Sequence, residues 1–334
     1  EFRRVLFRSL RMIYTDVDFN KKTVLITGGA GFIGSNIAFY LQENYPDCRV
    51  VLFDAFDLGH FKNLRGFKGE FISGDISSRD DLERLYDYDF DIIFHEAAIS
   101  DTTVMDQKLV TKINTNAFKD ILDIAVEMNA NIVYASSAGT YGNSAAPNCV
   151  GKGEEPENVY GFSKLMMDNI AYRYMKEFPH IRIVGLRYFN VYGPREVYKG
   201  KTASMMLQLG LQMLAGKTPK LFKWGGQKRD FVYIDDVVQG NILASVSKEN
   251  GVFNIGAGEA REFNEVFGEL QSSLDLECSV EYIDNPWSFY QNHTEADITP
   301  TSKALGYKPR FKIEEGIAAY ASEIRAIFEK ELTK

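Results

Sequence analysis

Short apolar runs alternate with amphipathic stretches along the first 190 residues of the chain. The runs are rich in β-branched and aromatic residues and are apolar on both faces, so each predicts a strand buried within a parallel sheet. The expected strands lie at residues 23–29, 49–56, 69–75, 90–98, 130–137 and 181–193. The stretches between them have helical apolar spacing and predict helices that cover both faces of this sheet. The expected helices lie at residues 32–45, 81–88, 112–129 and 160–178.

The regular alternation ends near Pro194, and the elements that follow are shorter and of mixed type. A helix is expected near 204–215, followed by short strand-like segments. We therefore predict a dinucleotide-binding domain, interleaved with a smaller mixed α/β substrate-binding domain. The predicted ranges are 23–189 plus 229–256 for the first domain, and 190–228 plus 257–334 for the second.

The first 22 residues are expected to form an N-terminal tail. Residues 1–11, EFRRVLFRSLR, carry four arginines and one glutamate, whereas the chain as a whole is acidic. They lack the apolar core and the small-residue cleavage site of a signal peptide. Because Met12 can serve as a start, we interpret residues 1–11 as an extension foreign to the natural protein. The alternative is a genuine basic arm.

Composition narrows the class of protein. With 334 residues, 45% of them hydrophobic, the chain can bury an extensive core in one large domain or two closely associated ones. Its net charge of −8 argues against a nucleic-acid or anionic-membrane partner. No apolar run reaches the ~18 residues that a bilayer span requires. The cysteines Cys48, Cys149 and Cys278 form no disulfide or metal pattern, which favours a cytoplasmic protein without a bound metal.

A glycine-rich turn gives the first chemical signal. Gly28, Gly31 and Gly34 lie between an expected strand and an expected helix, and Asp54 ends the next strand 20 residues later. This context is typical of a Rossmann-type, doubly wound dinucleotide-binding sheet. Gly28 would allow the tight turn, Gly31 the approach of a pyrophosphate, and Gly34 close packing of helix on strand. The helix N-terminus would hold the phosphates.

The choice of dinucleotide depends on the residues around Asp54. Its carboxylate would accept hydrogen bonds from the adenosine ribose, which favours NAD, whereas NADP requires a nearby cation. The candidate cations His60, Lys62 and Arg65 follow within eleven residues, but none comes directly after Asp54. Asp75, just past the third strand, would contact the adenine or, alternatively, cap the next helix.

A candidate catalytic group follows the fifth strand, which ends in Ser136 and Ser137. Tyr160 and Lys164 are four residues apart, one helical turn, so the ammonium group should lower the pKa of the phenol. A phenolate with a nearby serine hydroxyl would remove a proton from an alcohol as hydride passes to a nicotinamide. Asn114, polar on an apolar helix face, would lie beneath this site or mark a helix kink.

The segments TGGAGFIG, HEAA, YASSAGTYG, YGFSK and RYFNVYGPR resemble the extended short-chain dehydrogenase/reductase family over residues 23 to about 330. The resemblance implies that Tyr160 and Lys164 are the family's Tyr-x-x-x-Lys pair and Ser137 its catalytic serine. The implied cofactor contacts are Gly28, Gly31, Phe32, Ile33, Gly34, Asp54, Asp75, Ile76, Glu96, Ala97, Ala98, Ser100, Asn114, Lys164, Val191 and Lys199.

Within this family, Ala138 and Gly139 stand where dehydratases carry an acid pair, which argues against elimination of water. The segments FNVYGPREVYKGKTAS, PKLFKWGGQKRDFVYIDDV and FYQNHTEADIT look most like the enzymes that epimerise ADP-glyceromanno-heptose at C6. Those enzymes use a second base, a lysine shortly after GPRE, and the matching residue is Lys199. The implied substrate contacts are Ser100, Ser137, Asn190, Lys201, Gln208, Phe222, Lys223, Trp224, Gly225, Arg229 and Tyr290.

The resemblance implies an isomerase that converts the D-glycero form of the ADP-heptose into the L-glycero form. It would do so by transient oxidation with bound NADP, NAD being the other possibility. The product would feed lipopolysaccharide inner-core assembly in a Gram-negative cytoplasm, and a homo-oligomer is expected. The chain departs from the family pattern at Ala55, His60, Lys201 and Gln208. The alternatives are another nucleotide-sugar epimerase or reductase, and a non-catalytic dinucleotide sensor.

Overall fold

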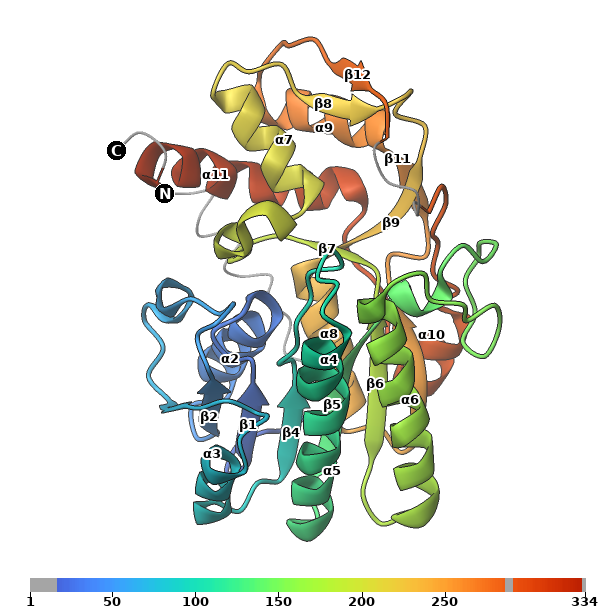
Figure 1. Cartoon of the computed structure of the whole chain (residues 1–334). Coiled ribbons are helices and arrows are strands. Elements are labelled where there is room, and N and C mark those ends of the chain that lie inside the picture. The colour runs from blue at the N-terminus through green and yellow to red at the C-terminus, as the bar shows by residue number, and fades with distance from the viewer. Residues whose placement is uncertain (1–16, 286–290, 332–334) are drawn as a thin grey trace.

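A seven-stranded, all-parallel sheet forms the centre of the molecule in the computed structural model, which describes residues 17–285 and 291–331 (Figure 1). The strand order is β10-β6-β5-β4-β1-β2-β3, so the direction of winding reverses between β1 and β4. The doubly wound parallel sheet expected from the sequence is confirmed. Its strands are β1 (Thr23–Thr27), β2 (Arg49–Asp54), β3 (Glu70–Ser73), β4 (Ile92–His95), β5 (Asn131–Ser137), β6 (Ile183–Tyr188) and β10 (Gly251–Ile255).

Two layers of helices cover this sheet. On one face α2 (Phe32–Asn44) packs against α8 (Ile234–Ser245), and on the other α5 (Ala117–Glu127) packs beside α6 (Val159–Glu177). Successive side chains of a strand point to opposite faces. Along β1, Val24 and Ile26 therefore join one apolar cluster and Leu25 joins the other. This double burial explains why the strand sequences are apolar throughout.

Short helical segments connect the strands at both ends of the sheet. The stretch expected as one helix at 112–129 instead contains two helical segments in direct succession, a π-helix followed by an α-helix, and α4 directly precedes them. No helix in the described part of the chain is long and apolar enough to cross a membrane. The connecting segments are η1 (Phe61–Leu64), α3 (Arg79–Glu83), η2 (Arg84–Asp87), α4 (Gln107–Val110), the π-helical η3 (Thr111–Asn116), and η4 (Ala138–Tyr141).

A smaller lobe lies beyond the carboxyl ends of the central strands (Figure 1). It contains the sheets β11-β9-β7 and β12-β8 and the packed helices α7, α9 and α11. The division of the chain between the two domains stays a prediction. Besides α8 and β10 of the larger part, the elements after β6 are β7 (Asn190–Tyr192), η5 (Val197–Thr202), α7 (Met205–Leu214), β8 (Lys220–Phe222), β9 (Lys228–Tyr233), β11 (Ala260–Glu262), α9 (Phe263–Leu274), β12 (Glu281–Ile283), α10 (Thr299–Leu305) and α11 (Ile313–Glu331).

The segment 181–193 differs from the single strand that its sequence predicts. It forms β6 in the large sheet and β7 in the small one, with a break at Phe189. The N–H of Phe189 still donates to the carbonyl of Ile255 in β10, at 3.0 Å, whereas β7 pairs with β9. This crossing carries the chain from one sheet to the other directly above the carboxyl ends of the central strands.

Candidate functional site

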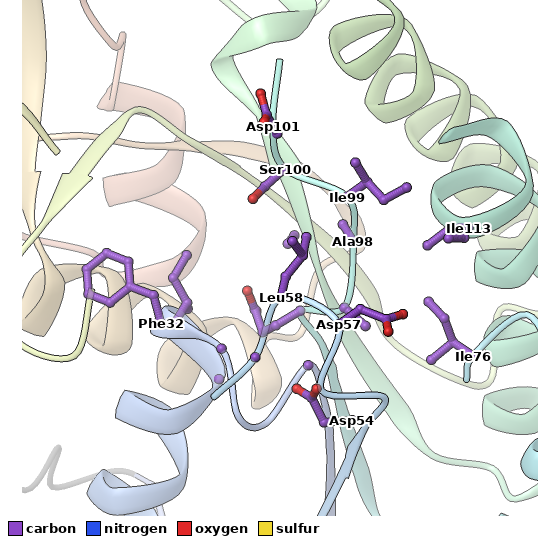
Figure 2. A pocket seen from close by; sticks show the side chains of 18 of the residues that line it. Phe32, Asp54, Asp57, Leu58, Ile76, Ala98, Ile99, Ser100, Asp101 and Ile113 are labelled. Atoms are coloured by element: carbon purple, nitrogen blue, oxygen red, sulfur yellow. The ribbon is translucent and has the colours of Figure 1, made fainter. Parts of the chain in front are cut away.

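A cavity of about 650 Å³ opens where the winding of the sheet reverses, at the carboxyl ends of β1, β2, β4 and β5 (Figure 2). Ligands of doubly wound sheets bind at this position. Most of the residues expected to bind a cofactor or to act in catalysis line it. These are Gly28, Gly31, Phe32, Ile33, Gly34, Asp54, Asp75, Ile76, Glu96, Ala97, Ala98, Ser100, Ser137, Tyr160, Lys164, Val191 and Lys199.

The glycine-rich turn has the geometry that a dinucleotide phosphate needs. Gly28 has φ +67°, and a Cβ there would lie 2.7 Å from the backbone nitrogen of Ala97. A Cβ on Gly34 would lie 2.3 Å from the carbonyl oxygen of Gly28, so helix and turn approach too closely for a side chain. No side chain caps the N-terminus of α2. Its positive end can therefore hold an anion.

The carboxylate of Asp54 closes the end of the cavity below this turn. Its Oδ2 accepts a hydrogen bond from the Ala30 N–H at 2.9 Å, and its Oδ1 accepts one from the Phe56 N–H at 2.7 Å. Burial raises the pKa of Asp54, and the two backbone donors oppose that rise. Each oxygen retains a lone pair that can accept a ribose hydroxyl.

Asp75 lines the cavity at the end of β3. Its Oδ1 accepts hydrogen bonds from the backbone N–H and the hydroxyl of Ser77, both at 2.8 Å. The alternative expectation, that Asp75 caps the next helix, is wrong. Ser78 is the N-cap of α3 and accepts from the N–H of Asp81.

The Tyr-x-x-x-Lys pair lies in the first turns of α6, which begins where Asn158 Oδ1 accepts the N–H of Gly161 at 2.8 Å. The Lys164 Nζ atom is 5.9 Å from the ring centroid of Tyr160 and donates to the carbonyl of Ala135 at 2.7 Å. Lys164 is fully buried, and burial lowers its pKa to about 8. The lysine is thus fixed to the carboxyl end of β5, facing the cavity beside the phenol.

The pKa of Tyr160 differs from the expectation. Burial raises it above the ordinary value, and a hydrogen bond with Ser137 opposes this rise. The predicted lowering by Lys164 is wrong for this structure, because desolvation of the phenol dominates. The phenol of Tyr160 therefore holds its proton more firmly than a free tyrosine does, and it lies against Ser137, the serine expected beside it.

Asn114 lies beneath the site without lining the cavity. Its side chain accepts from the N–H of Ile99 at 2.8 Å and donates to the carbonyl of Ile99 and to Ser163 Oγ, each at 3.0 Å. Ser163 in turn donates to the carbonyl of Tyr160 at 2.7 Å. The fully buried amide thus joins the loop after β4 to the first turn of α6, and it sits within the π-helical segment.

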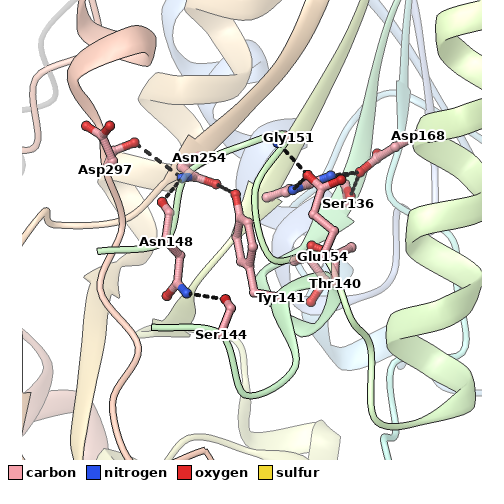
Figure 3. Close-up of polar contacts among 12 residues, drawn as sticks. Ser136, Thr140, Tyr141, Ser144, Asn148, Gly151, Glu154, Asp168, Asn254 and Asp297 are labelled. Carbon is pink, nitrogen blue, oxygen red and sulfur yellow. Dashed lines mark hydrogen bonds and ion pairs between the residues drawn. The ribbon is translucent and has the colours of Figure 1, made fainter. Parts of the chain in front are cut away.

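A buried polar network supports this site from behind (Figure 3). Arg187 in β6 donates through Nε and Nη2 to Asp168 Oδ2 at 3.0 and 2.8 Å, and through Nη1 to Glu154 at 2.5 Å. Asp168, one turn after Lys164, also accepts from Tyr134 and from Ser136, the neighbour of Ser137. This network was not predicted from the sequence, although an arginine inside the apolar run of β6 is a visible signal of a buried ion pair.

Lys199 approaches the cavity from η5 in the smaller lobe. Its Nζ lies 5.5 Å from the ring centroid of Phe32 at the start of α2. Burial lowers its pKa, and Glu196 opposes this shift. The neighbouring Tyr198 stacks on His60, with ring centroids 4.1 Å apart and planes 14° from parallel. The segment that carries Lys199 is therefore held against the loop that follows β2.

The remaining expected substrate residues are scattered. Lys201 forms an ion pair of 3.2 Å with Asp101, which lines the cavity, whereas Gln208 donates to the carbonyls of Ala203 and Lys201. Tyr290 lies outside the described residues. Several residues are described but do not line the cavity: Asn190 at the start of β7, and Phe222, Lys223, Trp224, Gly225 and Arg229 on or near β8 and β9.

Sequence reasoning missed part of the cavity wall. The loop after β2 contributes Asp57, Leu58 and Gly59, and Tyr188 lines the wall at the end of β6. The rule that ligands lie beyond the strand ends would have identified both segments. The other missed lining residues are Phe53, Ala55, Gly74, Asp101, Val104, Leu109, Ile113, Ala135, Ser136 and Phe189.

Comparison with known proteins agrees with this geometry. Residues 24–256 match the NAD dependent epimerase/dehydratase family. The crystal structure of ADP-L-glycero-D-manno-heptose-6-epimerase from Helicobacter pylori is 51% identical, with a TM-score of 0.89, over 95% of this chain and 100% of that one.

More distant structures share the fold. UDP-glucose 4-epimerase from Thermotoga maritima, with UDP-glucose, is 28% identical with a TM-score of 0.85, over 91% of this chain and 99% of that one. UDP-glucuronic acid 4-epimerase from Bacillus cereus, in complex with UDP-glucuronic acid and NAD, is 29% identical with a TM-score of 0.81, over the same shares. The family inferred from the sequence motifs is thereby confirmed: this chain is an enzyme of the NAD-dependent epimerase/dehydratase family.

Proposed function

We propose that the enzyme inverts C6 of the heptose in ADP-D-glycero-β-D-manno-heptose and gives the L-glycero form. The observation that carries the proposal is the 51% identity to the Helicobacter pylori heptose epimerase, over nearly the whole of both chains. The cavity supports it, because it combines a dinucleotide-binding turn with two candidate proton carriers, Tyr160 and Lys199, that come from different lobes.

Inversion at a secondary alcohol requires that hydrogen leave one face of the carbon and return to the other. A single acid/base group serves only one face well, so two groups on opposite sides suit the reaction. Tyr160 approaches from α6 and Lys199 from η5. In our proposal one of them takes the C6 hydroxyl proton, and the other donates a proton to the oxygen of the 6-keto intermediate.

The residues of the cavity fit a nicotinamide dinucleotide. The uncapped start of α2 would hold the pyrophosphate, Asp54 the adenosine ribose, and Lys164 the nicotinamide ribose. A bound nicotinamide would supply the hydride acceptor and donor and, when oxidised, a positive charge that favours the phenolate of Tyr160. The Ser137 hydroxyl would orient the substrate oxygen beside that phenol.

The partly buried amine of Lys199 supports its proposed role. Because burial lowers the pKa of Lys199, a larger fraction of its amine is neutral near pH 7 than for an exposed lysine. A neutral amine can accept a proton, whereas an ammonium group can only donate one. No metal has a part in this proposal, and no cluster of three metal-ligating side chains occurs within residues 17–285 and 291–331.

Proton NMR of the purified protein with ADP-D-glycero-β-D-manno-heptose, without added cofactor, tests the proposal. We expect conversion to a mixture of the two C6 epimers, with no net consumption of NAD(P). Heat-denatured protein is the control. UDP-glucose and UDP-N-acetylglucosamine, assayed in parallel, should remain unchanged. If a UDP-sugar is epimerised but the ADP-heptose is not, even after NAD and NADP are added, this assignment is wrong.

A further inference from the structure

The end of the cavity beside Asp54 carries two negative charges. Asp54 and Asp57 both line it, and Figure 2 shows their side chains at the same end of the pocket. Asp57 is close enough to raise the pKa of Asp54. Among the described residues, the lysines that line the cavity are Lys164, beneath the catalytic tyrosine, and Lys199, against Phe32, and no arginine lines it.

The loop that carries Asp57 has several fixed contacts. Phe56 adopts φ +61°, donates its N–H to Asp54, and stacks its ring on Phe71 of β3 with centroids 4.8 Å apart. Gly59 packs so closely on the carboxylate that a Cβ there would lie 2.6 Å from Asp54 Oδ1. The N–H of His60 donates to the carbonyl of Ala30 at 3.1 Å. These contacts hold Asp57 beside Asp54.

The cations that could bind a 2′-phosphate are directed elsewhere. The His60 ring stacks between Phe61 and Tyr198, and its Nδ1 accepts the N–H of Lys62 at 3.1 Å. The Lys62 Nζ atom lies 5.4 Å from the ring centroid of Tyr198. Neither these two residues nor Arg65 lines the cavity.

We propose that Asp54 and Asp57 together make this enzyme selective for NAD over NADP. The resemblance of the sequence implies NADP, whereas the described cavity favours the cofactor that lacks the 2′-phosphate. Asp54 would accept hydrogen bonds from the free ribose hydroxyls of NAD. A 2′-phosphate would bring nearly two negative charges towards two carboxylates, with no lysine or arginine at that end to neutralise them. The inference rests on the proposed function only in assuming that a nicotinamide dinucleotide binds here.

The first test identifies the dinucleotide that the purified protein carries. Chromatography and mass spectrometry of the denatured extract should find NAD and NADH. Titration calorimetry on the cofactor-stripped protein should then give a Kd for NAD⁺ at least tenfold lower than that for NADP⁺. NADP in the extract, or equal affinity for the two cofactors, would overturn the proposal.

Matched variants test the role of each residue. Asp57→Asn should reduce the NADP⁺-to-NAD⁺ ratio of Kd at least threefold, and Ala55→Lys should reduce it at least tenfold by adding a cation beside Asp54. Asp47→Asn removes the same charge before β2, at the opposite end of that strand, and should leave the ratio unchanged. An unchanged ratio in Asp57→Asn would remove Asp57 from the proposal, and circular dichroism melting curves would verify that each variant is folded.

Ionic strength gives an independent readout, because screening weakens electrostatic repulsion. The selectivity of the wild type should fall between 50 and 300 mM NaCl, and that of Asp57→Asn should fall less. Selectivity independent of salt would contradict the repulsion. These binding measurements do not require turnover. NAD selectivity without heptose epimerisation would therefore refute the proposed function alone, and epimerisation with bound NADP would refute this inference alone.

Discussion

The hydroxyl of Tyr188 donates a hydrogen bond of 2.8 Å to Oε1 of Glu96, and both side chains line the cavity. The second carboxylate oxygen, Oε2, is buried and has no hydrogen-bond partner among the described residues. Burial raises the pKa of Glu96 to about 7, although Tyr188 and Lys164 oppose this rise. A carboxyl group at the edge of the cofactor site therefore titrates near neutral pH.

This titration should appear in the stability of the protein. A carboxyl whose pKa is higher in the folded state destabilises that state as the pH rises from about 4 towards 7. The amide of Glu96→Gln does not titrate and still accepts from Tyr188. We expect the free energy of unfolding of the variant, relative to wild type, to increase by about 2 kcal/mol between pH 5 and pH 8. Urea unfolding at both pH values measures this difference. The control Glu83→Gln, at an exposed site on α3, should show no such change in the free energy of unfolding. An effect of Glu96→Gln that is the same at both pH values would contradict the shifted pKa.

Tyr160→Phe removes the proposed acid/base hydroxyl and leaves the ring. We expect epimerisation to fall by about 10²–10⁴-fold while the affinity for the dinucleotide changes little. NMR of the C6 epimers gives the rate and calorimetry the affinity. Tyr172→Phe, at a residue on the same helix that is 44% exposed, should retain activity. Turnover within threefold of wild type in Tyr160→Phe would refute the role of this phenol.

Lys199→Met keeps most of the volume of the side chain and removes its amine. If Lys199 is the second proton carrier, kcat for the heptose should fall about 10²-fold with a small change in KM. Lys217→Met, in the exposed turn after α7, is the matched control. A raised KM with an unchanged kcat would show instead that Lys199 only binds the substrate.

The buried ion pair between Asp168 and Arg187 should contribute more to the stability of the fold than an exposed ion pair does. Asp168→Asn leaves the guanidinium of Arg187 without its buried partner, so we expect a loss of about 3–5 kcal/mol in the free energy of unfolding. Glu281→Gln breaks the pair with Lys220, in which both side chains are about half exposed, and should cost under ~1 kcal/mol. Equal effects in urea unfolding would show that Arg187 finds other partners.

Two glycines in helices should respond oppositely to alanine. Gly34→Ala places a methyl group 2.3 Å from the Gly28 carbonyl, so it should destabilise the fold by about 1–3 kcal/mol and weaken dinucleotide binding. Gly268→Ala in α9 meets no atom within 4 Å and should stabilise the helix by up to ~1 kcal/mol. Thermal unfolding of the two variants tests the pair. Similar changes in stability in both variants would mean that the glycine-rich turn at Gly28 can move to make room for the methyl group.

The central sheet and its cofactor turn could be predicted because their signals are local. Strands buried on both faces must be apolar, and a tight turn that meets a helix N-terminus needs glycine at Gly28 and Gly34. Strand ends then locate Asp54 and Ser137 without any knowledge of side-chain contacts. The residues expected to contact a cofactor at these strand ends could therefore be inferred from their spacing in the sequence alone.

The remaining features depend on tertiary packing, which spacing does not encode. The pKa of Tyr160 follows from how deeply its phenol is buried, which a sequence separation of four residues from Lys164 cannot reveal. The separation of Trp224 from the cavity depends on the course of β8 in the smaller lobe. Asp57 belongs to an irregular loop whose direction is set by Phe56 and Gly59, so neither helical nor strand periodicity could place it in the wall.

The stack of His60 on Tyr198 makes the two lobes mechanically dependent on each other. The loop after β2, which lines the cavity beside Asp54, touches the segment that carries Lys199. Movement of this loop away from the cavity would separate the two rings and would shift the segment that carries Lys199. Opening of the cavity at this end would thus be coupled to displacement of Lys199, the proposed second base.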